Sequence, residues 1–321
     1  MDPPPDRMAH SPLRVILADE VARAVSYEAL VPRLEDAFRA FSARDGSVQQ
    51  PLRSVLHLEE HGGYLLEMPS YLREEGILAT KILTLYQPKH DGRTPSMTDH
   101  NAIVLLMEPT TGSFKAVMDG SVITHMRTAA VSAIATKYLA KPESHVLCIL
   151  GAGKQAESHY HALMSVHKFN EVRLWSRTQE SCESLVSCLP PGIQIYPDVE
   201  SAVSGADVIV TVTRAMEPIL KGRWIKPGAH INVVGACRPN WREVDDDAMR
   251  GCTLYVDDTE AACNESGDVI LSGAKIFAEL GEVISGTKPS LKDHTTIFKS
   301  SGLAFQDAVA AKMVYDNLKD D

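Results

Sequence analysis

The stretch from residue 146 to residue 156 limits most strongly what this chain can fold into. Five apolar residues, Val146–Leu150, are typical of a strand that is buried on both faces. Gly151, Gly153 and Ala156 follow in a Gly-x-Gly-x-x-Ala pattern, and the sequence predicts that a helix begins at once. Gly151 allows a tight turn, Gly153 lets a pyrophosphate approach the backbone, and Ala156 lets the helix pack closely on the strand. The pattern predicts a dinucleotide site whose phosphate-binding residues are Gly151, Ala152, Gly153, Lys154, Gln155 and Ala156.

The charge of the chain argues against several kinds of partner. Its 321 residues carry 32 Lys and Arg against 42 Asp and Glu, a formal net charge of −10. An acidic chain is a poor match for nucleic acid or for an anionic membrane surface. No apolar run reaches the roughly 18 residues that would suggest a membrane span.

The cysteines and the N-terminal residues indicate in which cellular compartment the protein is expected. The six cysteines show no Cys-x-x-Cys spacing, so we expect reduced thiols and no metal site. Residues 1–11 contain no apolar leader segment, and we expect them to form a disordered tail. Together these features favour a cytoplasmic protein.

Two patterns of predicted elements divide the chain. Residues 14–119 contain a short strand, two helices and then five strands separated by turns, which predicts a helix pair beside an antiparallel sheet. After residue 146, strands alternate with helices, which is typical of a parallel, doubly wound sheet of the Rossmann type. We therefore predict an α/β protein with a cofactor-binding Rossmann domain over residues 128–299 and a second, α+β domain over residues 1–127 and 300–321. At its end the chain would return to the α+β domain in a last, amphipathic helix, which we expect from about Phe305 to Leu318.

The end of the second Rossmann strand predicts which nicotinamide cofactor is used. A carboxylate at this point would bind the ribose 2′-hydroxyl of NAD, whereas a small residue followed by arginine accommodates the 2′-phosphate of NADP. The strand ends in Ser176, Arg177 and Thr178, with no carboxylate among them. A guanidinium can bind a phosphate through two N–H groups. The sequence therefore predicts NADPH.

Two further strand ends should border the nicotinamide half of the cofactor. Ligands of such folds bind in the crevice outside the carboxyl ends of the strands. Gly235 suits a place where the backbone must approach a ring closely. The residues expected at these two ends are Thr211, Val212 and Thr213 after one strand, and Val234, Gly235 and Cys237 after the next.

The first half of the chain supplies three cations that would suit an anionic substrate. They are Arg53, Lys81 and Arg127, and the first two lie in otherwise apolar segments. A cation that points into such a sheet is costly unless it is paired. Each alone could equally be a surface cation whose stem lies along apolar surface. Three of them beside one domain junction favour a substrate site.

Several of these motifs together resemble one known family. Thr80-Lys81, Val117-Met-Asp-Gly120, Arg127-Thr-Ala-Ala-Val-Ser-Ala133, Leu150-Gly-Ala-Gly153 and Gly235-Ala-x-x-Pro239 are similar to the ornithine cyclodeaminase/mu-crystallin family, from about Pro51 to the C-terminus. Residues 227–232, 265–269 and 277–282 resemble its mu-crystallin members in particular. The resemblance implies a Rossmann domain, and a substrate-binding domain whose sheet forms a homodimer.

The resemblance also implies an activity and roles for particular residues. Mu-crystallin members reduce cyclic ketimines with NADPH and bind the thyroid hormone triiodothyronine. By match, Arg53, Lys81 and Arg127 would be the catalytic residues and would hold the substrate carboxylate, while His100 and Arg127 would approach the cofactor. Other residues that the resemblance places at the substrate or the cofactor are Glu265, Cys237 and Ser300.

Two positions depart from the cyclodeaminase members of the family. Cys237 stands where those enzymes carry an aspartate that handles the substrate amine, and a thiol cannot replace a carboxylate there. Leu66 stands where they carry a glutamate, and Glu67 is one step off, on the other face of a strand. Both differences argue against ornithine cyclisation. Alanine dehydrogenation stays open but would favour NAD, and a non-catalytic hormone-binding or crystallin role stays open as well.

The residues suggest a mechanism for ketimine reduction. Arg53 would grip the substrate carboxylate bidentately, with Lys81 and Arg127 adding positive charge. An imine accepts hydride better once it is protonated. Lys81, with a pKa lowered by burial and by neighbouring arginines, could deliver that proton. A substrate that arrives as an iminium, or a proton from water, remains the alternative.

Overall fold

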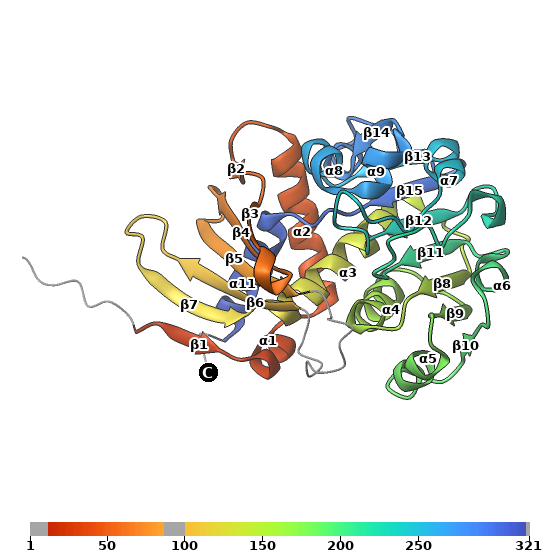
Figure 1. Ribbon diagram of the computed structural model, residues 1–321. Coiled ribbons are helices and arrows are strands. Elements are labelled where there is room, and N and C mark those ends of the chain that lie inside the picture. Colours follow the sequence, from red (N-terminus) through yellow and green to blue (C-terminus); the bar gives the residue numbers. More distant parts are fainter. Residues whose placement is uncertain (1–11, 87–99, 319–321) are drawn as a thin grey trace, which may run out of the picture.

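The computed structural model describes residues 12–86 and 100–318, which form two sheets with helices between and around them (Figure 1). The N-terminal tail that we predicted lies outside these residues. No helix of the described part is long and apolar enough to cross a membrane. Within the same ranges, no three His, Cys, Asp or Glu side chains gather closely enough to hold a metal ion. All six cysteines are unpaired.

The larger sheet has eight parallel strands in the order β10-β9-β8-β11-β12-β15-β13-β14. The chain starts in the middle at β8 and winds outward in both directions, which confirms the predicted Rossmann-type sheet. One strand, β14, was missed, because it has only four residues and pairs only with β13 at the sheet edge. The strands are β8 (Val146–Leu150), β9 (Glu171–Trp175), β10 (Ile193–Ile195), β11 (Val208–Thr211), β12 (His230–Val233), β13 (Thr253–Val256), β14 (Ile276–Glu279) and β15 (Thr296–Lys299).

Short helices connect these strands. β8 and β11 are buried along almost their whole length, as strands covered on both faces must be. The connecting helices are α4 (Lys154–Val166), α5 (Gln179–Val186), α6 (Val199–Val203), η2 (Gly222–Trp224), α7 (Asp246–Gly251), α8 (Thr259–Glu265), α9 (Gly267–Ser272) and α10 (Leu280–Ile284).

The smaller sheet has seven strands and is mixed, not antiparallel as predicted. β1 lies parallel to β7, with Arg14 opposite Ala116, while the other pairs are antiparallel. No hairpin turn joins β1 to β7, so no turn forces an antiparallel pairing on them. The strands are β1 (Arg14–Ile16), β2 (Val48–Gln49), β3 (Ser54–Leu58), β4 (Gly63–Leu72), β5 (Ile77–Tyr86), β6 (His100–Met107) and β7 (Phe114–Asp119), with a single 3-10 turn, η1 (Glu59–His61), between β3 and β4.

We expected strand β4 over residues 63–68, and it runs four residues further, through Pro69 to Leu72. On one side β4 pairs first with β3, as far as Glu67, and then with β2, from Tyr71 onward. Pro69 lies in the gap between them, where its missing N–H removes no hydrogen bond on that side. The segment 50–53, which joins β2 to β3, leaves the sheet at this gap. Arg53 is thereby directed away from the sheet.

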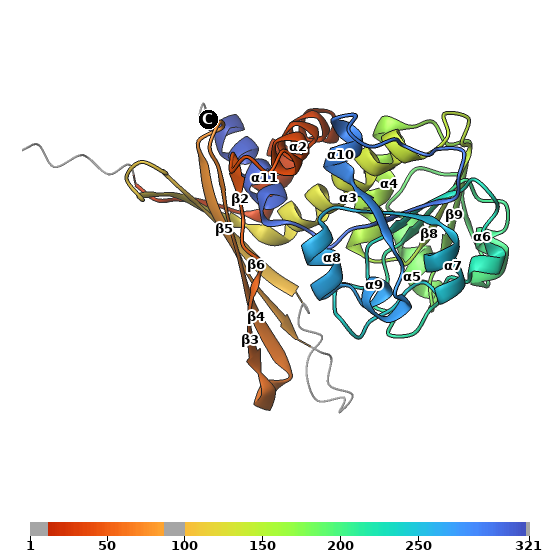
Figure 2. The same cartoon turned by 90° about the horizontal axis from the view of Figure 1, so that it is seen from above.

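Four helices pack on the smaller sheet. They are α1 (Ala18–Ala24), α2 (Tyr27–Ser42), α3 (Gly120–Leu139) and α11 (Ala304–Asn317). α2, α3 and α11 lie between the two sheets (Figure 2), and α1 packs on α3, α11 and β7. α3 leads from the smaller sheet to the larger one, so the domain boundary that we placed between residues 127 and 128 falls inside this helix.

The last helix packs back on the first half of the chain, as predicted. α11 contacts β4, β5 and β6 on one side and α2 and α3 on the other. We had expected an amphipathic helix, and this was wrong, because every residue from Ala304 to Ala311 is buried. A helix covered on both sides must be apolar all round, apart from side chains that find polar partners.

Candidate active site

Lys81 and Arg127 share one buried carboxylate, that of Asp307. Lys81 Nζ lies 2.6 Å from Asp307 Oδ2, and Arg127 Nε donates to Asp307 Oδ1 over 2.9 Å. Arg127 Nη1 also donates to Gln306 Oε1 over 2.8 Å. Lys81, Arg127 and Asp307 expose only 2%, 5% and 1% of their surfaces. Two of the three predicted cations therefore meet in the helical layer, held from the first turn of α11.

Strand alternation places Lys81 on the buried face of β5. Ala79, Lys81 and Leu83 are buried, whereas the residues between them are partly exposed. Burial lowers the pKa of Lys81 to about 7; the positive charges of Arg127 and Arg53 act in the same direction, and Asp307 acts against them. The ammonium of Lys81 therefore gives up its proton more readily than that of an ordinary, exposed lysine.

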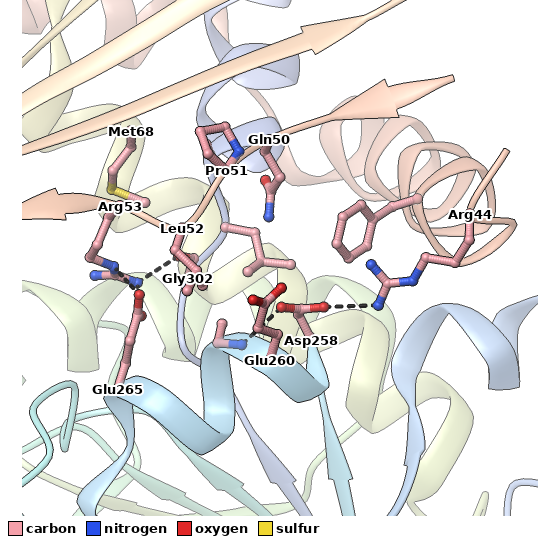
Figure 3. A pocket seen from close by; sticks show the side chains of 14 residues that line it. Arg44, Gln50, Pro51, Leu52, Arg53, Met68, Asp258, Glu260, Glu265 and Gly302 are labelled. Carbon is pink, nitrogen blue, oxygen red and sulfur yellow. Dashed lines mark hydrogen bonds and ion pairs between the residues drawn. The ribbon is translucent and has the colours of Figure 1, made fainter. Parts of the chain in front are cut away.

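Arg53 is the third cation, and it is held by Glu265 (Figure 3). Arg53 Nε donates to Glu265 Oε1 over 2.9 Å, and Nη2 lies 2.6 Å from Glu265 Oε2. Nη2 also donates to the carbonyls of Ser301 and Gly302 over 2.8 and 3.0 Å. Glu265 thus occupies the Nε–Nη2 edge of the guanidinium, so the expected bidentate grip on a substrate would involve Nη1, which has no hydrogen-bond partner among the described residues.

Gly302 lies in contact with the guanidinium groups of both Arg53 and Arg127. Its φ of 80° lies in the left-handed region that favours glycine, and a Cβ there would lie 2.8 Å from Arg127 Nη1. Its carbonyl accepts a hydrogen bond from Arg53. Asp257 Oδ2 accepts the backbone N–H groups of Ser301 and Gly302 over 2.7 and 2.8 Å. The turn between β15 and α11 thus positions both guanidinium groups.

A pocket opens beside Arg53 (Figure 3). The Arg53–Glu265 pair stands at one end of it, and Arg44 stands at the other, where its Nη2 donates to Asp258 Oδ1 over 2.9 Å. Leu52 lies between the two pairs. Segments from both halves of the chain form the walls, so the pocket lies at the junction of the two sheets.

The glycine turn has the geometry that a dinucleotide needs. β8 ends at Leu150, and α4 begins three residues after Gly151. Gly151 has a φ of 126°, and a Cβ there would lie 2.8 Å from the carbonyl oxygen of Val212. A Cβ on Gly153 would meet nothing within 4 Å, so the space above it is open to a phosphate. Together with the free N–H groups of the first turn of α4, this open space fits a pyrophosphate.

The predicted 2′-phosphate residues follow β9. Ser176 Oγ donates to the carbonyl of Thr178 over 2.6 Å, which tightens the loop. Arg177 is exposed and forms no ion pair with any described residue. Its guanidinium is therefore free to bind a phosphate at this strand end.

The ends of β11 and β12 lie in close contact. A Cβ on Gly235 would lie 2.0 Å from the carbonyl oxygen of Thr213, so only glycine fits at that position. Val212 and Val234 lie on the same two strand ends, and the Val234 N–H donates to the carbonyl of Thr211 over 3.0 Å. The five residues predicted at residues 211–213 and 234–235 therefore lie together at one edge of the sheet.

Glu243, which we did not predict, ties these two ends together. Its Oε1 accepts from the N–H and the hydroxyl of Thr213, both over 2.6 Å. Its Oε2 accepts from the Thr211 hydroxyl over 2.7 Å and from the Gly235 N–H over 2.6 Å. Glu243 is fully buried, and burial together with the nearby Asp268 raises its pKa. One carboxylate thus fixes the loops that face the crevice.

The loop after β12 also reaches across to the smaller sheet. Cys237 is exposed, and the guanidinium of the next residue, Arg238, lies 3.9 Å from the ring centroid of Tyr64 in β4. Further along β4, Leu66 is buried, whereas Glu67 is exposed on the opposite face. Within the described strand β4, the face that carries Leu66 therefore has no carboxylate, and a glutamate at this position was what the resemblance implied for a cyclodeaminase.

Two further predicted residues lie at strand ends. β6 begins at His100, whose side chain lies outside the part that the structure describes. Ser300 follows β15, and its buried hydroxyl has no hydrogen-bond partner among the described residues. Such a hydroxyl remains available to a bound molecule.

Asp307 and its neighbour Gln306 also escaped prediction. They stand together in the otherwise apolar stretch 303–311. Two adjacent polar residues in a helix that is buried all round were the signal, because each must find a polar partner. We expected an amphipathic helix here, in which polar residues need no buried partner, so this signal was not used.

Comparisons with known proteins show the family to which the chain belongs. The sequence model of the ornithine cyclodeaminase/mu-crystallin family matches residues 13–321. Ketimine reductase mu-crystallin of Rattus norvegicus is 55% identical over 302 residues, which cover 94% of this chain and 96% of that protein. Among solved structures, Delta(1)-pyrroline-2-carboxylate reductase of Thermococcus litoralis, in complex with NADH and L-proline, is 33% identical with a TM-score of 0.89 and covers 95% of this chain and 97% of that one. An archaeal alanine dehydrogenase dimer with bound NAD is 32% identical with a TM-score of 0.87 and covers 95% of each chain. The protein belongs to the ornithine cyclodeaminase/mu-crystallin family.

Proposed function

We propose that the protein uses NADPH to reduce cyclic ketimines, rings whose C=N carbon bears a carboxylate, to the saturated imino acids. Its family relatives named as reductases make it a nicotinamide-dependent oxidoreductase that acts on imines. The observation that carries the finer proposal is the charge of the site. Lys81, Arg127 and Arg53 meet two carboxylates, Asp307 and Glu265, so one positive charge is left for one substrate carboxylate.

The geometry supports different roles for the three cations: the two arginines would bind the substrate carboxylate, and the lysine would supply a proton. Arg53 Nη1 and Arg127 Nη2 have no partner among the described residues, so each can donate to a substrate carboxylate. Held in this way, the imine nitrogen would lie near Lys81 Nζ, which supplies a proton as the C=N bond is reduced. A bound nicotinamide supplies the hydride.

The choice of NADPH rests on Arg177. The guanidinium stands free after β9, with Ser176 before it and no carboxylate in the loop. A 2′-phosphate would pair with this cation, whereas the 2′-hydroxyl of NADH would meet no carboxylate in this loop. NADPH is therefore the proposed cofactor, although two of the structural relatives hold NADH or NAD.

We also propose that triiodothyronine competes for the same site. The hormone carries a carboxylate that the same cations would accept. Tyr64, Leu66 and Leu83 form an apolar wall on the face of the smaller sheet that also carries Lys81. Such a wall suits the apolar rings of the hormone. The non-catalytic alternative, a hormone-binding or crystallin protein, would use the same contacts without turnover.

A homodimer is the proposed assembly. Large apolar side chains are exposed on strands of the smaller sheet, among them Val15, Val55, Leu56, Ile103 and Phe114. Exposed apolar surface of this kind is typical of a protein interface. We propose that two copies pair through this sheet, and sedimentation in solution would measure the assembly.

The test is NADPH oxidation with piperideine-2-carboxylate, followed by nicotinamide absorbance beside the same assay with NADH. Turnover that favours NADPH, and that triiodothyronine inhibits, is the expected result. Tight NADPH binding without turnover on any cyclic ketimine would replace this proposal by the non-catalytic one. Steady NADH turnover with pyruvate and ammonia would instead indicate an alanine dehydrogenase.

A further inference from the structure

The first turn of α11 places a carboxylate between two buried cations. Asp307 is 1% exposed, and its two oxygens are divided between Lys81 Nζ at 2.6 Å and Arg127 Nε at 2.9 Å. The three side chains come from three different elements, β5, α3 and α11. A carboxylate near a helix N-terminus is also favoured by the helix dipole. Asp307 is therefore held as an anion at a defined place.

Without this anion the two cations could not both stay charged. Burying two like charges side by side is unfavourable, and arginine does not give up its proton in proteins. Lysine does, so Lys81 would be the group that becomes neutral. A neutral Lys81 has no proton to give to an imine.

We propose that Asp307 is a positioning residue that keeps Lys81 protonated and aimed, so that Lys81 can act as the acid of the reduction. This inference rests on the proposed function, in which Lys81 is the proton donor. Asp307 itself need not touch the substrate, because both of its oxygens are engaged by Lys81 and Arg127.

The charged groups that face Lys81 give the direction of the effect. They are Arg127 from α3, Arg53 from the segment before β3, and Asp307 from α11. Burial and the two arginines lower the pKa of Lys81, and Asp307 is the group that raises it. For Asp307, burial acts to raise the pKa, but Arg127 and Lys81 outweigh burial and the pKa is lowered. Asp307 therefore stays ionised over the range in which Lys81 titrates.

The experiment is the pH profile of kcat/KM for ketimine reduction in Asp307→Asn. Reduction needs the protonated form of Lys81, so the rate falls as pH rises through the pKa of Lys81. Removal of the negative charge lowers that pKa, and we expect the midpoint of the fall to move at least about one pH unit lower. The matched control is Gln306→Met, which removes the neighbouring contact to Arg127 without a change of charge and should leave the midpoint in place.

A second readout does not depend on turnover. Carbon-13 NMR of the lysine Cε titrates Lys81 directly, with Lys81→Met to assign its signal. The midpoint should move in the same direction in Asp307→Asn. If the wild-type protein reduces no ketimine, the proposed function fails, while this titration still tests the role of Asp307.

An unchanged midpoint in folded Asp307→Asn, by both readouts, would overturn the inference and leave Asp307 a purely structural residue. If that variant does not fold, Asp307→Glu takes its place. Glutamate keeps the charge but moves it by one methylene group, so the midpoint should stay within about half a unit while kcat falls at least roughly tenfold. A kcat equal to that of the wild type would then overturn the positioning role.

Discussion

Two buried clusters of charged side chains in this protein have different roles, although each contains a lysine and an aspartate. The substrate cluster consists of Lys81, Arg127 and Asp307. The loop cluster consists of Glu243, Asp268 and Lys299, all within the Rossmann half and all fully buried.

The two clusters differ in what their polar atoms contact. In the loop cluster, most partners are backbone groups or hydroxyls. Asp268 Oδ1 accepts the N–H groups of Glu243 and Val244, and Lys299 Nζ donates to the carbonyl of Ala236 over 2.8 Å. In the substrate cluster, side chains contact side chains, and an arginine nitrogen is left without a partner among the described residues.

This difference separates a scaffold from a reactive site. Charges tied to the backbone hold loops in place, and their partners cannot be exchanged without moving the chain. Cations that are paired with other side chains keep N–H groups without a partner, and these N–H groups can donate to a bound anion. Burial by itself therefore does not identify a reactive group.

Lys81→Met tests the substrate cluster and should have the largest effect. Methionine fills a similar volume but offers no proton, so we expect kcat for ketimine reduction to fall by about 10³-fold, with NADPH affinity little changed. Steady-state kinetics and fluorescence titration of NADPH would measure both. Lys81→Arg keeps the charge but not a proton that can be given up, and it should be equally inactive. Activity within tenfold of the wild type in either variant would contradict an acid role for Lys81.

Arg53→Ala should act on substrate binding. We expect KM for the ketimine to rise by roughly 100-fold, because a charge-assisted contact to the carboxylate is lost, while NADPH binding stays nearly intact. Arg44→Ala is the matched control, since it removes the other ion pair that lines the same pocket. An unchanged KM in Arg53→Ala, or an equal rise in Arg44→Ala, would remove Arg53 from the substrate site.

Glu243→Gln tests the loop cluster and should have the smallest effect on the reaction. The amide must turn its NH₂ group toward a donor, either at Thr213 or at Gly235, so at least one hydrogen bond is lost. We expect the free energy of unfolding to fall by about 1–3 kcal/mol, with kcat changed by less than roughly fivefold. Chemical denaturation and steady-state kinetics of Glu243→Gln and Lys81→Met, measured side by side, would compare the two variants in free energy of unfolding and in kcat. A loss of kcat comparable to that of Lys81→Met, at unchanged stability, would make Glu243 part of the reactive site.

Much of the fold could be predicted from local patterns. From the sequence we expected strands over residues 146–150 and 208–211, which are apolar runs, and over residues 77–86 and 171–175, which alternate; β8, β11, β5 and β9 have these bounds. The parallel pairing of β1 with β7 could not be predicted, because it joins segments about a hundred residues apart with no turn to set their direction. β14 was missed because four residues at a sheet edge show no periodicity.

The cations of the site and Glu265 were predicted, but the carboxylate that joins Lys81 to Arg127 was not. Arg53 and Lys81 stood out as charges in apolar segments, and the resemblance placed Glu265 at the substrate, whereas Asp307 comes from a distant part of the chain. A charge in an apolar segment shows that a partner must exist without showing which residue it is. The contact between Arg53 and Glu265 was likewise not predicted, because it joins residues that are 212 positions apart in the chain. The bidentate grip of Arg53 on a substrate stays a prediction.

The place of α11 in the chain has a consequence for biosynthesis. Asp307 leaves the ribosome after every strand and every other helix of the fold, so Lys81 and Arg127 are made long before their counter-ion. Until α11 docks, Lys81 and Arg127 lack the carboxylate that pairs with both of them. The substrate cluster is therefore completed only when the last described helix packs against β5 and α3.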